Sequence, residues 1–372
     1  MSYLGESIPK LGFGFMRLPM QGKAIDIGKT IEMTDAFIDG GFSYFDTAYV
    51  YYNGKSEEAI KAAVVDRYPR ERFQLATKLP PWDAETADDA KERFWTSLKR
   101  TGAEFFDFYL LHNVSSAYVG IFDSFGLWDF VLELKEKGLI RNAGFSFHDK
   151  ADVLDEILGK HPEMDFVQLQ INYADWESPS VQSRKCYEVA RKHDTPVIVM
   201  EPVRGGMLGD LLFPVVKSVF DEAGAGASYA SWAMRYAASI DGLITVLSGM
   251  STIEQVRDNV SFMKDFRPLD EGERAVVEKA RKALESLPSV PCTDCGYCLP
   301  GCPAGVAIPE ILEKLNRERV YNNPAGAKSG YLWEVEFGGK GSDCTECGNC
   351  EDICPQGIGI IELLKEAVAK YE

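Results

Sequence analysis

The chain has 372 residues, of which 45% are hydrophobic and 12% aromatic, so it can bury a large core, and no segment has the composition of a disordered region. Its formal net charge of −17 argues against nucleic-acid binding, which requires a basic surface to neutralise phosphates. The N-terminus shows no export signal and no apolar run approaches the roughly 20 residues of a membrane-spanning helix, so we expect a cytoplasmic protein without a membrane partner.

Short apolar segments alternate with amphipathic segments from residue 8 to about residue 263. Apolar runs of this length, separated by helical patterns, are typical of strands in a parallel sheet. We predict eight strands, at Leu11–Leu18, Ser43–Ala48, Gln74–Lys78, Asp107–His112, Arg141–Ser146, Phe166–Asn172, Val197–Glu201 and Ile244–Ser248.

The segments between these strands show helical spacing. Apolar residues form one stripe in "SEEAIKAAVVDR" and another in "TADDAKERFWTSLKRTG", where Gly102 is expected to end the helix. Eight strand–helix units in about 255 residues predict an α/β fold, a (β/α)₈ barrel. The alternative is a doubly wound open sheet, but the G-x-G-x-x-G turn that usually follows its first strand is absent.

A last helix and a linker rich in proline and serine follow the eighth unit. We therefore expect two domains, a barrel at 1–285 and a linker with a small, mainly helical domain at 286–372. Within the second, "PEILEKLNRERV" and "IIELLKEAVAK" have helical patterns, and an aromatic, glycine-rich stretch, "SGYLWEVEFGGKGS", lies between them.

Polar residues stand at the ends of successive predicted strands. Asp46, Lys78 and His112 end the second, third and fourth strands. Because active sites of such barrels lie at the C-terminal ends of the strands, we expect these three side chains to converge. Later strands carry further polar residues at the same end, namely Ser146, Gln168, Glu201 and Ser248.

Eight of the nine cysteines lie in the last 81 residues, and the ninth, Cys186, is expected to be a small packing residue. The pattern C-x₂-C-x₂-C-x₃-C-P occurs twice, which is the ferredoxin-like spacing for two [4Fe–4S] clusters in which each fourth cysteine binds the other cluster. Structural zinc, the alternative, explains neither the third cysteine nor the proline. The expected ligand sets are Cys292, Cys295, Cys298 with Cys354, and Cys344, Cys347, Cys350 with Cys302.

Three segments of the barrel resemble the aldo-keto reductase family: "YFDTAYVYYNGKSEE", "LATKLP" and "FYLLHN". The resemblance implies a catalytic tetrad of Asp46, Tyr51, Lys78 and His112. Tyr51 would donate a proton to the carbonyl oxygen, with its pKa lowered by Lys78, which Asp46 would hold charged and aimed. His112 would orient the substrate.

The same resemblance implies NAD(P)H as cofactor, with Ser146 and Gln168 against the nicotinamide carboxamide. This chain departs from the family at Phe147, where asparagine is usual, at Met200, where an aromatic residue stacks, and at Thr252, where a basic residue is common. Ser251 and Glu254 also match a helix capping box. The cofactor-binding residues that we expect are Ser146, Gln168, Met200, Glu201, Arg204, Gly205, Gly206, Ser248, Gly249, Ser251, Gln255 and Asn259, with the glycines as a phosphate cradle.

The sequence therefore predicts an iron–sulfur oxidoreductase acting on a small carbonyl or alcohol substrate. Hydride transfer needs no iron, so we expect the clusters to exchange electrons between a ferredoxin-like partner and the barrel cofactor, with a flavin such as FMN as an alternative to NAD(P)H. Two other hypotheses stay open. In the first, the protein is a plain carbonyl reductase that uses NAD(P)H and has structural clusters. In the second, it is a redox sensor or an electron-transfer protein whose barrel does not catalyse.

Overall fold

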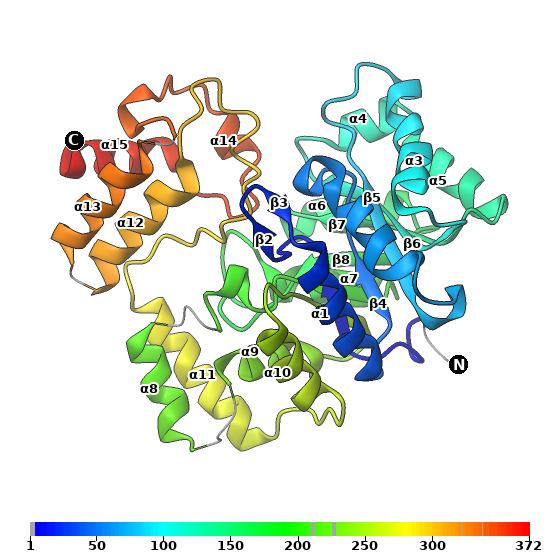
Figure 1. Ribbon diagram of the computed structural model, residues 1–372, viewed down its shortest axis with the longest axis horizontal. Helices are drawn as coiled ribbons and strands as arrows, with labels where there is room; N and C mark the ends of the chain where they lie inside the picture. Colours follow the sequence, from blue (N-terminus) through cyan, green and yellow to red (C-terminus); the bar gives the residue numbers. More distant parts are fainter. Residues whose placement is uncertain (1–3, 210–212, 225–227, 322, 337) are drawn as a thin grey trace. The chain divides into compact units, whose positions relative to one another are not determined.

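Eight parallel strands close into a barrel in the computed structural model, which describes residues 4–209, 213–224, 228–321, 323–336 and 338–372. The order around the barrel is β1-β10-β9-β8-β7-β6-β5-β4, and β1 closes it by pairing with β4 (Figure 1). The predicted (β/α)₈ fold is confirmed. The strands are β1 Leu11–Gly14, β4 Tyr44–Asp46, β5 Gln74–Leu79, β6 Phe106–Val114, β7 Ile140–Phe147, β8 Phe166–Gln170, β9 Val197–Met200 and β10 Leu243–Gly249.

Helices cover the outer face of the barrel, and most of them alternate with the strands along the chain (Figure 1). Helix α3 begins with a reciprocal capping box between Thr86 and Asp89, and it ends at Gly102, which has the left-handed conformation that the sequence predicts for a helix C-terminus. The barrel helices are α1 Ile27–Asp39, α2 Lys55–Ile60, α3 Ala87–Thr101, α4 Val119–Ser124, α5 Leu127–Glu136, α6 Ala151–Lys160, α7 Ser183–Lys192, α9 Tyr229–Ala238 and α10 Ile253–Met263.

One strand end was predicted wrongly, and two other segments show details that their patterns did not specify. The first strand ends at Gly14 instead of Leu18, because the chain turns and forms a short antiparallel hairpin, β2 Met20–Gln21 with β3 Ala24–Ile25. The helix after β4 is shorter than its pattern, and it continues as a π-helical segment at Lys61–Val65. Part of the glycine-rich stretch forms α13 Pro324–Glu334, which Asn323 caps by accepting a hydrogen bond from the Gly326 N–H.

Contacts between Cα atoms divide the chain into two compact units. The first unit holds 1–178, 182–203 and 227–274, and the second unit holds 179–181, 204–226 and 275–372. Helix α8 Pro214–Glu222 belongs to the second unit, and α11 Glu271–Glu285 begins in the first and continues in the second. The division at 285 remains a prediction. No helix in the described parts of the chain has both the length and the apolar character to cross a membrane.

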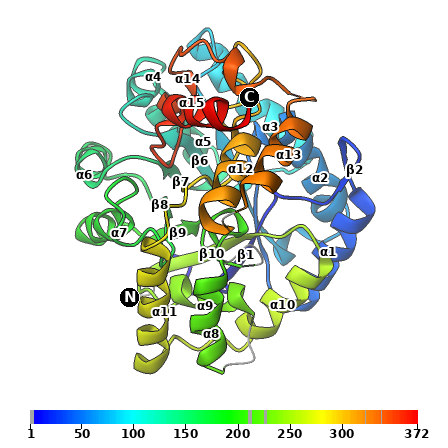
Figure 2. The same ribbon diagram turned by 90° about the vertical axis from the view of Figure 1, so that its left-hand side faces the viewer.

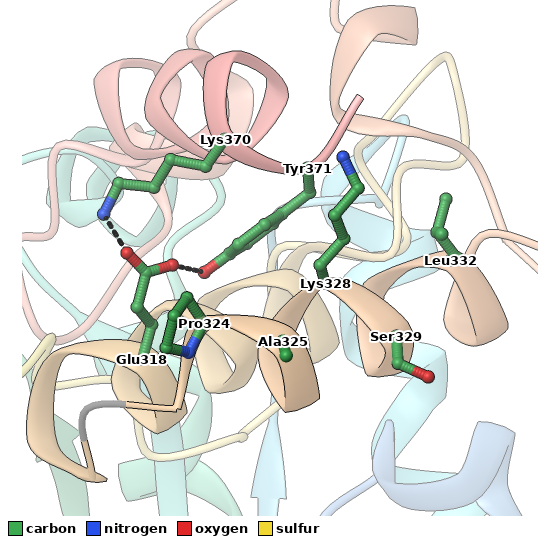
Figure 3. A pocket seen from close by; sticks show the side chains of 8 residues that line it. All are labelled: Glu318, Pro324, Ala325, Lys328, Ser329, Leu332, Lys370 and Tyr371. Atoms are coloured by element: carbon green, nitrogen blue, oxygen red, sulfur yellow. Dashed lines mark hydrogen bonds and ion pairs between the residues drawn. The ribbon is translucent and has the colours of Figure 1, made fainter.

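The second unit has a core of its own. Helices α12 Ile308–Tyr321, α13 and α15 Ile360–Tyr371 pack together, with the short helix α14 Asn349–Asp352 before α15 (Figure 2). The three long helices border a surface groove, in which Glu318 of α12 accepts hydrogen bonds from Lys370 and Tyr371 of α15 at 2.8 and 2.7 Å (Figure 3). Residues of α12 and α15 thus fix the two helices to each other.

Apolar residues pack on both faces of the barrel sheet, in two layers. The inner one fills the barrel with Tyr44, Ala76, Phe108, Leu110, Phe166, Ile198, Ile244 and Leu247. The larger outer layer lies between strands and helices and includes Phe45, Leu75, Leu111, Phe145 and Phe147. Because side chains alternate along a strand, a residue two positions after an inner-layer residue also faces the barrel axis. This rule decides which polar residues reach the mouth.

Gly144 of β7 tests the packing of the inner layer. A Cβ atom at this position would lie 2.4 Å from the Phe166 carbonyl oxygen, which backbone pairing holds in place. We predict that Gly144→Ala lowers the free energy of unfolding by about 2 kcal/mol or more, as overpacking does elsewhere. Gly120→Ala is the matched control, since that exposed helical glycine has no neighbour within 4 Å and should gain up to about 1 kcal/mol. Urea midpoints that shift equally in both variants would contradict this.

Candidate active site and cysteine clusters

Strand alternation brings the three predicted polar residues to the barrel mouth. Asp46, Lys78 and His112 each follow an inner-layer residue by two positions, namely Tyr44, Ala76 and Leu110. Each is therefore directed to the inside, at the C-terminal end of its strand. Tyr51 comes from the short 3₁₀ helix Tyr51–Gly54 that follows β4. The structure thus brings together all four residues of the expected tetrad.

Lys78 is the centre of this group. Its ammonium donates to Asp46 Oδ1 at 2.5 Å, to the Thr47 carbonyl at 2.7 Å and to the Tyr51 hydroxyl at 3.4 Å. The other oxygen of Asp46 accepts from Gln168 Nε2 at 3.2 Å. The lysine side chain is only 1% exposed, so its position is set by these contacts and not by water. Lysine and tyrosine are held within hydrogen-bonding range.

Burial and charge act in opposite directions on the buried pair. Burial lowers the pKa of Lys78, while the neighbouring carboxylates of Asp46 and, more weakly, Glu57 raise it again. Burial likewise raises the pKa of Asp46, and Lys78 opposes that rise. An ammonium group beside the Tyr51 hydroxyl favours the phenolate over the phenol, which is the requirement for a tyrosine that gives up a proton.

His112 is neutral at ordinary pH. Burial lowers its pKa well below the usual value, and the nearby charges of Lys78 and His148 lower it further. The rings of Trp82 and Tyr51 lie 5.2 and 5.9 Å from the imidazole, measured between ring centroids. A neutral imidazole in such surroundings can orient an oxygen atom by a hydrogen bond without adding a charge.

Ser146 and Gln168 face each other across β7 and β8, where they are paired in register. The Ser146 oxygen accepts from the Asn113 N–H at 2.8 Å, so its own O–H remains available to donate. The Gln168 amide donates to Asp46, which leaves its carbonyl oxygen to accept. One donor beside one acceptor is the complement of a primary amide, and these residues therefore fit a nicotinamide carboxamide.

The residues at the ends of β7 and β9 near this pair do not all face the barrel axis. The Phe147 side chain belongs to the outer layer, 2% exposed and 6.4 Å from the Phe145 ring between centroids, so it faces away from the barrel axis. Met200 ends β9 and is partly buried. Glu201 follows with a φ of 54°, and its carbonyl accepts from Asn172 at 3.0 Å. Strained backbone of this kind is common where a loop is fixed near a site.

Residues at the start of α10 are largely bonded to one another. Asn259 donates to the Ser248 oxygen at 2.9 Å, and the Gln255 side chain accepts from the Ser251 N–H at 2.8 Å. Thr252 is the N-cap and accepts from the Gln255 N–H, so the capping box that we predicted from Ser251 and Glu254 was wrong. The reason is that α10 begins at Ile253, one residue later than that pattern requires.

Three residues near the mouth were not among the predicted ones. The Arg17 side chain crosses Gly249, where a Cβ atom would lie 3.3 Å from it, and the Arg17 carbonyl accepts from Ser251 at 2.7 Å. Trp82 and His148 lie beside His112. Each of the three stands within a few residues of a strand end, and that position is the one sequence feature that could have indicated them. The direction of a loop side chain, however, is decided by the folded structure.

Arg204, Gly205 and Gly206 belong to the second unit. Gly205 has a φ of 63°, and a Cβ atom on it would lie 2.2 Å from the Thr293 carbonyl oxygen. Close approach of two backbones is therefore a sufficient reason for this glycine, without a bound phosphate. Arg204 is buried, with its Nη1 3.8 Å from the sulfur of Met207.

The cysteines form two groups that join distant parts of the second unit. One cavity is lined by Cys302 together with Cys344, Cys347 and Cys350. In the other group, burial and then the neighbouring thiols Cys295, Cys292 and Cys354 raise the pKa of Cys298. Among the described residues, no three His, Cys, Asp or Glu side chains lie close enough to hold a single metal ion. Four thiols around one cavity fit a larger group, a [4Fe–4S] cluster.

Comparison with known families supports both parts of the chain. Residues 10–282 match the family model described as "Aldo/keto reductase family", and residues 291–358 match that of a "4Fe-4S dicluster domain". An uncharacterised oxidoreductase of Bacillus subtilis, YqkF, is 24% identical over 309 residues, which cover 75% of this chain and 92% of that protein.

Solved structures give the same fold. The holo form of aldo-keto reductase AKR11C1 from Bacillus halodurans superposes with a TM-score of 0.62 at 25% identity, and covers 76% of this chain and 96% of that one. An aldo-keto reductase from Klebsiella pneumoniae in complex with NADPH gives a TM-score of 0.58 at 23% identity, with 75% and 95% covered.

Cys302 tests the grouping of the thiols. We predict that Cys302→Ala damages the cluster held by Cys344, Cys347 and Cys350 and leaves the other one in place, because Cys302 lines that cavity. Iron analysis and electron paramagnetic resonance after anaerobic reconstitution should show about half of the iron remaining. Cys186→Ala, which changes a buried cysteine of α7, is the control and should lose none. Loss of the cluster bound by Cys292, Cys295 and Cys298 instead would contradict the grouping.

Proposed function

The chain belongs to the aldo/keto reductase family and is an oxidoreductase, and we propose that its barrel reduces a carbonyl group with hydride from NAD(P)H, or oxidises the alcohol in reverse. The observation that carries the proposal is the contact of the buried Lys78 ammonium with both Asp46 and the Tyr51 hydroxyl. A barrel without catalysis would gain nothing from burying that charge, since buried ion pairs contribute little to stability.

Each residue of the tetrad has a defined task in this reaction. The nicotinamide, when bound, supplies the hydride to the carbonyl carbon. The Tyr51 hydroxyl gives its proton to the carbonyl oxygen, and Lys78 stabilises the phenolate left behind. Asp46 keeps the lysine charged and in place. The neutral His112 donates a hydrogen bond to the same oxygen and orients it.

Two further observations support a nicotinamide cofactor. The O–H of Ser146 and the side-chain carbonyl of Gln168 match the two halves of a carboxamide. The relative from Klebsiella pneumoniae binds NADPH with the same fold. Met200 offers no aromatic ring for stacking, and Thr252 serves as a helix cap without bringing a positive charge. For that reason a flavin such as FMN remains the second candidate, and the absorption spectrum of the purified protein distinguishes the two.

The second unit would bind two [4Fe–4S] clusters through the two groups of cysteines. Such clusters, when bound, carry one electron at a time. We propose that they exchange electrons between a ferredoxin-like partner and the barrel cofactor. Two complete ligand sets support this proposal, because a single metal site would be enough to stabilise so small a unit.

A structural role is the competing proposal, and one observation favours it. Cys350 belongs to the apolar core of the second unit, and five other cysteines pack against that core, namely Cys292, Cys298, Cys302, Cys344 and Cys354. Ligands placed in this way would fix the core through the clusters without any transfer of electrons. Under this alternative the protein is a carbonyl reductase that depends on NAD(P)H alone.

Tyr51 and Lys78 test the catalytic part. We predict that Tyr51→Phe and Lys78→Met each lower kcat for carbonyl reduction at least about 100-fold, the lower end of what a lost general acid costs. Tyr52→Phe is the matched control, because its hydroxyl bonds the Leu18 carbonyl at 3.4 Å and takes no part in the tetrad. Normal turnover by Tyr51→Phe would show that another group donates the proton.

The role of the clusters is tested by anaerobic reduction. We predict that protein with reduced clusters passes electrons to its barrel cofactor or to an added acceptor, followed by the absorption of cluster and cofactor in a stopped-flow instrument. Protein freed of iron but still folded by circular dichroism should lose this transfer. If it keeps full carbonyl reductase activity and the clusters exchange no electrons, the structural role is the correct one.

A further inference from the structure

His148 lies at the mouth of the barrel next to the tetrad. It follows β7 directly, and its N–H still bonds the Val114 carbonyl of β6 at 3.4 Å. The β6–β7 register shifts between Leu111 and Val114, so that β6 carries one extra residue opposite β7. A bulge of this kind redirects side chains, and Asn113 inside it has a φ of 59°. The local distortion therefore falls at His112 and at the strand end that carries His148.

His148 lies one residue beyond β7, and continuing the alternation of that strand directs its side chain inward. Phe145 and Phe147 lie in the outer layer, so Ser146 and His148 face the barrel axis. Two further facts agree with this. Beyond the effect of burial, Lys78 lowers the pKa of both imidazoles, and His148 is near enough to His112 for its protonated form to lower the pKa of His112. Atom Nδ1 of His148 is completely buried and has no hydrogen-bond partner among the described residues.

Four other polar groups of the mouth already have tasks. Tyr51 and His112 serve the reacting oxygen, and Ser146 with Gln168 complements the carboxamide. A buried polar atom without a partner is costly, and a ligand that supplied a hydrogen bond to His148 Nδ1 would remove that cost. His148 stands beside the end of β6, because its N–H bonds the Val114 carbonyl, so a substrate with oxygen atoms on two adjacent carbons would present one oxygen to His112 and the other to His148.

We propose that His148 determines specificity by hydrogen-bonding a second oxygen atom on the carbon next to the reacting carbonyl, so that the barrel prefers α-hydroxy carbonyl compounds to simple ketones. This inference rests on the proposed carbonyl reduction and names its substrate class. The second group is uncharged. Burial, with Lys78 nearby, lowers the pKa of His148 to about 4, so the imidazole is neutral near pH 7 and offers no charge to a carboxylate.

The kinetic test compares 1-hydroxybutan-2-one with butan-2-one. We expect His148→Phe, which keeps the bulk of the ring, to lower the ratio of their kcat/KM values about tenfold, the effect of one hydrogen bond in a buried site. His148→Asn, whose amide can replace Nδ1, should keep the ratio within about threefold of the native one. Comparing the ratio between variants cancels the different reactivity of the two ketones. An unchanged ratio in His148→Phe overturns the proposal.

His193→Ala is the control, because that histidine stands at the end of α7 and pairs with Asp155 of α6, in the helical layer outside the barrel. The dissociation constant of NADPH, measured by fluorescence, adds a second readout. A weaker NADPH complex in His148→Phe together with an unchanged ketone ratio would place His148 on the cofactor, and would overturn the proposal as well.

A measurement without turnover separates this inference from the proposed function. The chain has four histidines, so ring signals of histidine-labelled protein can be assigned with single variants. In the presence of NADPH, which cannot accept hydride from an alcohol, butane-1,2-diol should shift the signals of His112 and His148, whereas butan-2-ol should shift that of His112 alone. A His148 signal that the diol leaves unchanged overturns the inference. Failure of the native protein to reduce either ketone, with the His148 shift present, overturns the carbonyl reductase proposal instead.

Discussion

The buried ammonium of Lys78 is the constraint on which the site depends. A charge that is 1% exposed must be compensated, and Asp46, the Thr47 carbonyl and the Tyr51 hydroxyl surround it for that reason. Glu57 adds a second buried carboxylate whose charge also acts on Lys78, and it is held by Thr77 and Arg100. The strand ends, the short helix at Tyr51 and the inner layer are therefore coupled through one group.

The alternation of side chains along each strand explains how the barrel separates its packing residues from its catalytic residues. Alternation sends every second residue inwards, so that apolar residues fill the interior and the next inward position on several strands is polar. Gly144 leaves room for Phe166 below Ser146, and Ser146 and Gln168 then meet at the mouth. The outward positions, including Phe147, pack under the helices and contribute stability. Chemistry and packing thus use opposite faces of the same strands.

The stability of the second unit is linked to its cysteines as well as to its core. Its core is small, and the cysteines near it come from segments about fifty residues apart along the chain. Bringing Cys302 to Cys344 and Cys350 closes a long loop, which costs chain entropy that a bound cluster would offset. Stability of this unit and binding of iron are therefore linked, whether or not electrons move through the clusters.

Much of the architecture was predictable because it depends on local patterns. The eight strands and the end of α3 at Gly102 follow from periodicity and from residues with strong backbone preferences. The convergence of Asp46, Lys78 and His112 was predictable as well, because parallel strands end at one edge. The spacing of the cysteines likewise indicated which distant thiols share a cavity.

Other features were decided only by tertiary contacts. The hairpin after β1, the start of α10 at Ile253 and the outward direction of Phe147 depend on register and on neighbours that a local pattern does not specify. Gly205 fits a phosphate cradle by sequence, yet its close approach to Thr293 appears only in three dimensions. His148 was missed because its position just after a strand is a weak signal, which many loop residues share. The sequence determines which residues are present at a strand end, whereas bulges and packing decide where they point, because those depend on residues far apart in the chain.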